Sequence, residues 1–398
     1  PESNAPQHYS ATQEIKLDRH IVMPGLINSH CQSSTRLLRG NGDTVLTQLT
    51  SNITSESQQS LVVDSDFVAD SSILATAEMI KTGTTCFVDM SFPHETLLAT
   101  VRNSGLRCHI AFIVCGNPTP FAQSPDRHIH EGLSLYDKIG EHPQMQVGCA
   151  LQTLNSLSDS VLQQLSTYAN ELELPLHIPC HSTLEEINQS LLQHNHRPID
   201  RLNNAGLLSP QARLVNINQI QADDLQLLSE TNTHIVQCPS SSFDKQQSED
   251  LVEQLQQSNI NIALGSGESA TDNTFDLLSL LKNCVQIRTN NDKHSQQINA
   301  HAALRSATIN GARALGWQQE IGSIEVGKSA DIIALEIDPI VQLPLYNPQT
   351  QLIYNFNGNQ VSHSWVAGNA LMEDKKLLHL NEKKLAQLAS LWHEKLAM

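Results

Sequence analysis

Short apolar runs alternate with longer amphipathic stretches along most of this chain. The apolar runs cover residues 21–28, 84–90, 107–115, 146–151, 175–180, 213–219, 234–238 and 261–266. Between them, apolar residues recur at helical spacing in segments such as 65–81, 158–173, 221–230 and 274–287. The pattern therefore predicts eight strands with helices between them.

Strands that alternate with helices pair in parallel, because each helix returns the chain to the starting end of the sheet. Eight such units in about 250 to 300 residues match the size of a (β/α)8 barrel. A doubly wound open sheet is the alternative, but no Gly-rich phosphate-binding turn follows the first predicted strand. We expect an α/β protein of the TIM-barrel class, with its chemistry at the carboxyl ends of the strands.

The chain continues past the predicted barrel with strand-forming segments. Residues 322–335 indicate a turn and a strand, and residues 360–372 indicate a hairpin. Because so few strands need further partners, segment 9–20 is a candidate to join them. We predict a remnant N-terminal sandwich segment over 1–20, a barrel over 21–320, C-terminal sandwich strands over 321–372 and a C-terminal helix over 373–398.

Composition narrows the range of partners. The 398 residues contain no apolar run long enough to span a bilayer, which needs about 18 residues. Lysine and arginine total 24 against 41 acidic residues, so a net charge of -17 argues against nucleic acids and anionic membranes. The eight cysteines form no C-x-x-C pair and fall mostly in apolar runs. Reduced, buried thiols are expected, and with them a cytoplasmic location.

The first predicted strand ends in a candidate metal-binding pair that is incomplete. It reads V-M-P-G-L-I-N-S-H-C-Q over residues 22–32. Side chains alternate along a strand, so His30 and Gln32 point the same way. Zinc and iron favour imidazole, thiolate and carboxylate over a neutral amide. His30 is therefore interpreted as a polar residue of the barrel mouth rather than as one of two metal ligands.

Several motifs together resemble the amidohydrolase superfamily. They are V-M-P-G-L-I-N-S-H, L-L-R-G (37–40), A-E-M-I-K-T-G-T-T-C-F-V-D-M (77–90), C-P-S-S-S (238–242), A-T-I-N-G-A-R-A-L-G (307–316) and I-G-S-I-E-V-G-K-S-A-D (321–331). The branch that the chain is most similar to contains S-adenosylhomocysteine/methylthioadenosine deaminases, guanine deaminases and chlorotriazine hydrolases. The resemblance runs from about residue 12 to the end. It implies a (β/α)8 barrel flanked by a small β-sandwich built from both chain ends, and a homo-oligomer such as a dimer.

The resemblance also implies a mechanism. Such enzymes bind one divalent metal through His-x-His on strand 1, a histidine on strand 5 and an aspartate on strand 8, and the metal activates a water that attacks an amidine-like carbon. A strand-5 glutamate and the aspartate move protons, while a strand-6 histidine polarises the attacked centre.

The matching positions of this chain carry mostly other residues. His30 matches the first ligand and Gln32 the second, whereas Pro179 falls on the strand-5 ligand and Ser182 on the glutamate. The remaining positions hold Gln152 after strand 4, Asn216 on strand 6, Gln237 and Ser242 in the strand-7 motif, and Gly267 at the strand-8 aspartate. The predicted pocket comprises these residues together with His181 and Glu268.

The leading hypothesis is a catalytically degenerate member, a pseudoenzyme, that needs no cofactor and does not run the family reaction on a purine- or triazine-like heterocycle. It would keep a pocket for a small heterocyclic ligand, or act as a binding or regulatory subunit. An alternative is an active hydrolase of C–N bonds, in which His30, His181 and Glu268 rebuild a zinc or iron site. Nucleophilic serine catalysis lacks both a Gly-x-Ser-x-Gly elbow and an acid/base partner.

Overall fold

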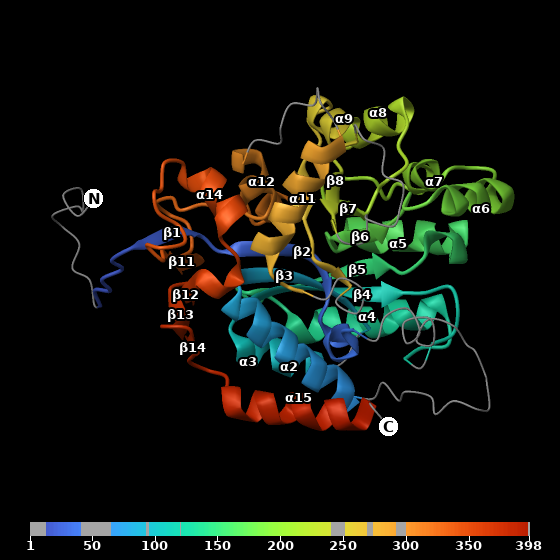
Figure 1. Ribbon diagram of the computed structural model, residues 1–398. Coiled ribbons are helices and arrows are strands. Elements are labelled where there is room, and N and C mark those ends of the chain that lie inside the picture. Colours follow the sequence, from blue (N-terminus) through green and yellow to red (C-terminus); the bar gives the residue numbers. More distant parts are fainter. Residues whose placement is uncertain are drawn as a thin grey trace.

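A ring of parallel strands forms the centre of the molecule (Figure 1). The computed structural model describes residues 13–40, 65–92, 95–119, 121–239, 251–268, 274–291 and 300–396. The barrel strands are β2 (Leu26–Gln32), β3 (Thr84–Ser91), β4 (Arg107–Val114), β5 (Met145–Leu151), β6 (Leu176–Pro179), β7 (Ala212–Val215), β8 (His234–Gln237) and β9 (Ile262–Leu264). Each pairs in parallel with the next, which confirms the predicted α/β barrel.

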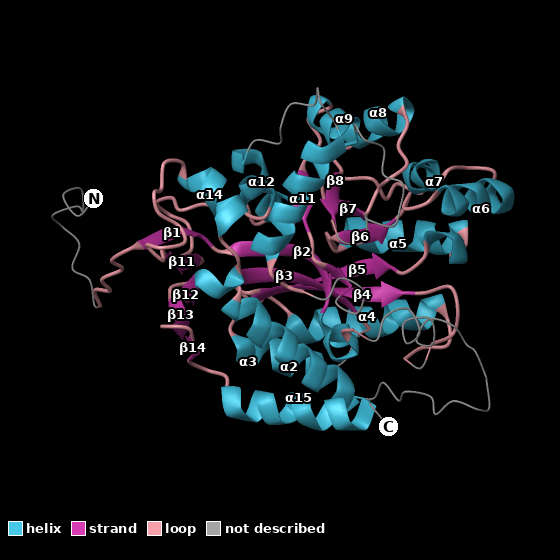
Figure 2. Cartoon of the chain, in the orientation of Figure 1, coloured by secondary structure: helices cyan, strands magenta, loops and turns pink. Residues whose placement is uncertain are grey.

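Helices surround these strands (Figure 2). They are α2 (Ser65–Lys81), α3 (Glu95–Ser104), α4 (Pro125–Ile139), α5 (Asp159–Glu171), α6 (Leu184–His194), α7 (Pro198–Asn204), α8 (Ala222–Glu230), α9 (Leu251–Gln257), α11 (Leu277–Asn291), α12 (Ala300–Ser306) and α13 (Ile309–Ala314). Local signals set their starts: the Ser124, Ser158 and Thr183 side chains accept the N–H groups of Arg127, Val161 and Glu186. Within the described ranges, no helix is both long and apolar enough to cross a membrane.

Two apolar layers hold the barrel together. Strands β3 and β4 are buried along their whole length, as expected for parallel strands covered on both faces. Phe87 and Ile110 belong to the layer between strands and helices, whereas Val88 and Ala111 belong to the barrel interior. Helix α13 contributes Ala312 to the same interior cluster. The barrel is thus a packed core rather than a pore.

The ring closes between its first and last strands by a short seam. Beyond β9, the two-residue strand β10 (Gly267–Glu268) pairs in parallel with Cys31 and Gln32 of β2. The Asn28 side chain reinforces this seam, because its Nδ2 donates to Ser266 Oγ at 2.8 Å and its Oδ1 accepts from Ser266 N at 2.9 Å. A buried amide therefore makes two of the contacts that join the barrel ends.

A five-stranded antiparallel sheet lies beside the barrel and uses both ends of the chain (Figure 1). Its order is β1 (His20–Pro24), β11 (Ile332–Glu336), β12 (Val361–Val366), β13 (Asn369–Glu373) and β14 (Lys376–Leu377). The sequence predicts one strand over 21–28, but Gly25 interrupts it, and the segments before and after Gly25 form the separate strands β1 and β2. Gly25 has no room for a Cβ, which would meet Thr85 Oγ1 at 2.1 Å. The added strand is β1, which shares only His20 with the predicted segment 9–20, and residues 1–12 lie outside the described part.

A buried ion pair connects this sheet to the barrel. Arg107, the first residue of β4, places Nε 2.7 Å from Asp331 Oδ2 just before β11. Both side chains are almost fully buried. Asp331 Oδ1 also accepts the N–H of Ala367 at 2.9 Å, so the carboxylate joins three segments.

The end of the chain folds back on the barrel helices. After α14 (Pro348–Asn355) and the β12–β14 strands, α15 (Glu382–Leu396) packs against α2 at the bottom of the view (Figure 1). The helix predicted over 373–398 begins only at Glu382, because the residues before it form the end of β13, a turn and β14. Trp392 Nε1 donates to Asp70 Oδ2 at 2.8 Å, and its ring meets Phe67 edge-on at 5.2 Å.

Candidate functional site

A β-bulge in the first barrel strand turns His30 into the barrel. Asn28 pairs with Phe87, and Cys31 pairs with Asp89, so β2 advances three residues while β3 advances two. The extra residue changes which side chains face inward. Cys31 consequently packs in the outer layer, with its Sγ 3.2 Å from the Val88 carbonyl oxygen, whereas His30 meets residues of the opposite barrel wall.

His30 contacts His177 of β6 directly. The Nδ1 of His30 lies 2.6 Å from the Nε2 of His177, and the rings stack with centroids 4.8 Å apart. Burial lowers the pKa of His30 to about 4 and that of His177 well below its usual value. Because one proton must lie between the two nitrogens, Nδ1 of His30 is occupied by this hydrogen bond and is not available to a metal.

Further polar residues fill the barrel interior next to His177. Burial and the nearby Arg213 guanidinium lower the pKa of His109 on β4, and Arg213 NH1 lies 3.4 Å from His109 Nδ1. Arg213 Nε donates to the Ala314 carbonyl at the end of α13. Burial lowers the pKa of Arg213 to about 9. This cluster connects two strands to the helix that packs in the barrel, and neither His109 nor Arg213 is exposed at the mouth.

At the end of β6, Pro179 occupies the position that the family resemblance assigns to a metal ligand. Its side chain has no donor or acceptor atom. Ser182, at the position of the expected glutamate, donates its N–H to Glu186 Oε2 at 2.9 Å, and its carbonyl accepts from Asn218 Nδ2. Pro179 therefore cannot bind a metal through its side chain, and a serine hydroxyl cannot replace a carboxylate as a general base near neutral pH.

His181 is fully buried and held by hydrogen bonds to backbone groups. It adopts a positive φ of 57°. Its Nδ1 donates to the Gln219 carbonyl at 2.9 Å, and its Nε2 accepts the Ile199 N–H at 3.3 Å. Burial lowers its pKa to about 4, although Asp224 favours the charged form. With both ring nitrogens engaged, His181 fixes two loops and does not join His30.

The amides of Asn216 and Gln237 connect neighbouring strand ends. Asn216 Oδ1 accepts the Cys238 N–H at 2.9 Å, and Gln237 Nε2 donates to the Ile217 carbonyl at 3.1 Å. Asn216 has a positive φ of 58°, which asparagine tolerates better than most residues. Both predicted pocket residues therefore position the backbone at the ends of β7 and β8.

The end of the last strand lies beside β2. Gly267 pairs with Cys31 and has a φ of 79°, and Glu268 pairs with Gln32. The side chain of Glu268 and all of Ser242 lie outside the described part of the structure. Gly265 packs so closely on His30 that a Cβ would lie 2.8 Å from the His30 Cβ.

The implied metal does not fit the described residues. They include no group of three or more histidine, cysteine, aspartate or glutamate side chains arranged around a common point. A catalytic metal site normally needs three protein ligands, and here the available nitrogen of His30 has no such partners in the described ranges. No catalytic step can be built through a metal from these side chains.

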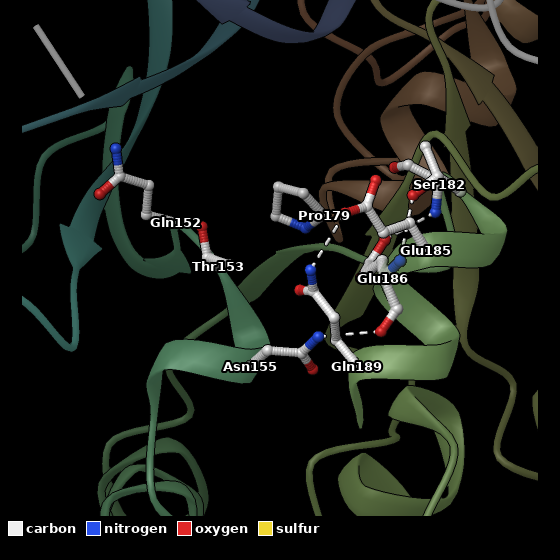
Figure 3. Close-up of a pocket in the computed structure, with 9 residues that line it drawn as sticks. Gln152, Thr153, Asn155, Pro179, Ser182, Glu185, Glu186 and Gln189 are labelled. Carbon is white, nitrogen blue, oxygen red and sulfur yellow. Dashed lines mark hydrogen bonds between the residues drawn. The ribbon is translucent and has the colours of Figure 1, made fainter. Parts of the chain in front are cut away.

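A cleft opens at the ends of β5 and β6, next to the start of α6 (Figure 3). Its volume is about 280 Å³, and its wall includes Gln152, Thr153, Asn155, Pro179, Ser182 and the first turns of α6. The cleft thus brings together three of the predicted pocket residues, Gln152, Pro179 and Ser182. The Oε1 of Gln152 accepts from Cys115 Sγ at 2.6 Å, which fixes the orientation of its amide.

The sequence reasoning missed two carboxylates near the strand ends, of which only Glu186 lines the cleft. Asp89, at the end of β3, accepts from Ser33 N at 2.8 Å and Ser33 Oγ at 2.6 Å, and burial raises its pKa to about 6. Glu186 accepts the N–H groups of His181 and Ser182. The signal for Glu186 was present, because Thr183-Leu184-Glu185-Glu186 follows the capping-box pattern.

Comparison with known proteins agrees with the fold. The amidohydrolase family profile matches residues 21–371. The chain is 36% identical over 398 residues to a 5-methylthioadenosine/S-adenosylhomocysteine deaminase of Teredinibacter turnerae, covering 100% of this chain and 90% of the relative. It is 31% identical to the protein of the same name in Saccharophagus degradans, covering 100% and 89%. A solved adenosine deaminase of Xanthomonas campestris with bound zinc superposes with a TM-score of 0.87 at 27% identity, covering 95% and 86%.

Proposed function

Because this chain belongs to the amidohydrolase family, we propose that it binds a small amino-substituted heterocycle at the barrel mouth without performing the metal-dependent deamination for which its relatives are named. The ligand positions carry this proposal, since His30 is the one histidine left among them and the described residues hold no group of three ligand side chains around it. Pro179, Gly267 and Ser182 support it, because Pro179 and Gly267 carry no ligand atom in their side chains and the Ser182 hydroxyl cannot replace the carboxylate as a general base.

The cleft supports the binding half of the proposal. It lies at the carboxyl ends of the strands, where barrel proteins bind their ligands. Its wall is held by hydrogen bonds such as Ser182 N to Glu186 Oε2, so its shape exists before a ligand arrives. A preformed cleft costs less ordering on binding than a flexible one.

An active hydrolase is the second candidate. The names of the relatives favour it, since the chain matches two proteins named as deaminases over its full length. The backbone pairing of Glu268 with Gln32 also places a carboxylate-bearing residue near the end of β2. In this alternative, His30 would bind a metal through Nε2 together with Glu268, while its Nδ1 keeps the contact with His177.

Elemental analysis separates the two candidates. Protein purified without chelators should contain zinc, iron, manganese and nickel below about a tenth of an equivalent, and it should release no ammonia from adenosine or 5′-methylthioadenosine. His30→Ala should behave the same way, as should His234→Ala, a control on a strand histidine distant from the mouth. Near-stoichiometric metal that is lost in His30→Ala but kept in His234→Ala would contradict the proposal and favour the active hydrolase.

A further inference from the structure

The loop between β11 and α14 exposes four large apolar side chains to water. Ile340 is 92% exposed, Val341 61%, Leu343 50% and Tyr346 89%. The other exposed large apolar residues of the described ranges occur mostly as single residues or pairs along the chain. Scattered residues of this kind are ordinary, whereas a cluster marks a binding surface. These four side chains are called the 340–346 patch below.

The loop that carries the patch is held by hydrogen bonds from polar side chains. Gln342 is buried, its Oε1 accepts the Asp338 N–H at 2.7 Å, and its Nε2 donates to the Asn355 carbonyl at 3.3 Å. From α14, Gln351 Nε2 donates to the Pro344 carbonyl at 2.8 Å. These bonds fix the loop without the four exposed side chains. Folding of the chain therefore does not explain why those side chains are apolar.

The charge of the surrounding sequence indicates which partner the patch fits. No Asp, Glu, Lys or Arg occurs between positions 339 and 362, although the chain carries 41 acidic and 24 basic side chains. Two copies of an acidic chain repel each other, and this repulsion is weakest across an uncharged face. A basic partner would instead be attracted to the acidic surfaces. We propose that the 340–346 patch is the contact between two copies of this chain, related by a twofold axis.

The composition and size of the patch agree with a second copy as the occupant. The centres of interfaces are depleted of charged residues and enriched in tyrosine, which Tyr346 supplies here. The four residues expose on the order of 500 Å² together, more than most monomers leave in one apolar patch. A twofold axis brings the patch against itself and buries about 1,000 Å² in total, which is the lower limit for a specific interface. We therefore expect a dimer that forms at micromolar concentration.

The patch and the cleft lie on different sides of the molecule. The loop between β11 and α14 lies on the left of the view, whereas α6 and the neighbouring cleft lie on the right (Figure 1). A dimer formed through the patch leaves both clefts open. The inference is thus independent of the proposed function, and either can fail without the other.

Sedimentation velocity of the full chain at about 1–100 µM tests the inference. At the upper concentrations the chain should sediment with twice the 43.9 kDa of one copy. Ile340→Asp brings two negative charges together across the axis and should raise the dimer Kd at least about tenfold. The matched control is Leu192→Asp on α6, because Leu192 is 87% exposed but lies outside the patch. It should leave the Kd unchanged, and neither variant should shift the urea midpoint.

Cross-linking locates the contact by a second route. Seven of the eight native cysteines are buried and Cys284 is partly buried, so an added surface thiol reacts above a low background. A short bismaleimide should join two copies of Tyr346→Cys, but not two copies of Leu192→Cys. Three results would overturn the inference: a monomer at every concentration, a dimer Kd unchanged in Ile340→Asp, or cross-linking of Leu192→Cys alone. A monomer at every concentration would assign the patch to a different occupant.

Discussion

The Nδ1 of His30 and the Nε2 of His177 are 2.6 Å apart, although the two residues belong to strands on different sides of the barrel. Both imidazoles are neutral near pH 7, because burial lowers the pKa of each. The contact spans the barrel interior between β2 and β6. Its consequences can be measured through stability.

Acidification should weaken the fold through His30. Its pKa is about 4 when folded and 6.5 in the unfolded chain, so the unfolded state binds more protons between these values and stability falls as pH drops from 6.5 to 4. The loss is on the order of 2–3 kcal/mol. Urea unfolding at pH 7.5 and 5 should show a smaller pH effect in His30→Asn than in the parent chain. Equal pH effects in both would contradict the assignment.

Gly265→Ala should destabilise the barrel mouth. The new methyl group would lie 2.8 Å from the His30 Cβ, 2.9 Å from the His30 carbonyl oxygen and 3.0 Å from Cys238 Sγ. Because the nearest atoms are a Cβ, a backbone oxygen and a cysteine sulfur, which cannot move far, we expect the free energy of unfolding to fall by about 1–3 kcal/mol in chemical denaturation. Gly265 does not have a positive φ, so this cost comes from crowding and not from backbone strain. An unchanged free energy of unfolding in Gly265→Ala would show that crowding at His30 is unimportant.

Breaking the buried ion pair of Arg107 and Asp331 should lower the free energy of unfolding far more than breaking an exposed ion pair. Asp331→Ala leaves a guanidinium without its partner in the interior, which costs about 3–5 kcal/mol. Lys81 and Glu382 lie 2.8 Å apart, but both side chains are more than two-fifths exposed. Glu382→Gln should change the free energy of unfolding by less than about 1 kcal/mol. Similar losses in both variants would contradict the structural role of Asp331.

His181→Ala should reduce stability and leave metal content unchanged. The substitution removes the hydrogen bonds that the imidazole makes with the Ile199 N–H and the Gln219 carbonyl in the interior. This loss should lower the free energy of unfolding by about 2–4 kcal/mol. His379, an exposed histidine that contacts the Ala370 carbonyl, serves as the control and should lose little as His379→Ala. If His181→Ala instead removed bound metal from an otherwise stable protein, His181 would be a ligand and the rebuilt site would be correct.

Hydrophobic periodicity was sufficient to predict the barrel strands. The predicted runs 84–90 and 107–115 correspond to β3 and β4, because fully buried parallel strands are continuous apolar segments. The division of run 21–28 could not be predicted in the same way. Both halves are apolar, and only the close approach of Gly25 to Thr85, a long-range contact, shows where one sheet ends and the other begins.

The site was harder to predict than the fold. Spacing placed His30 at a strand end, but its partner His177 lies 147 positions away and no local pattern connects the two. His181 looked like a candidate ligand because it ends a strand. Its left-handed backbone conformation and its bonds to Gln219 and Ile199 depend on loops that alternation along a strand cannot describe.

The seam made by Asn28 and Ser266 has a consequence for the order of events during synthesis. These residues are 238 positions apart, and β10 pairs with β2 only beyond residue 266. A ribosome must therefore finish nearly the whole barrel before the first strand can meet its final neighbour. Until then β2 has an open edge, and the nascent chain presents unpaired backbone groups that invite association with other chains.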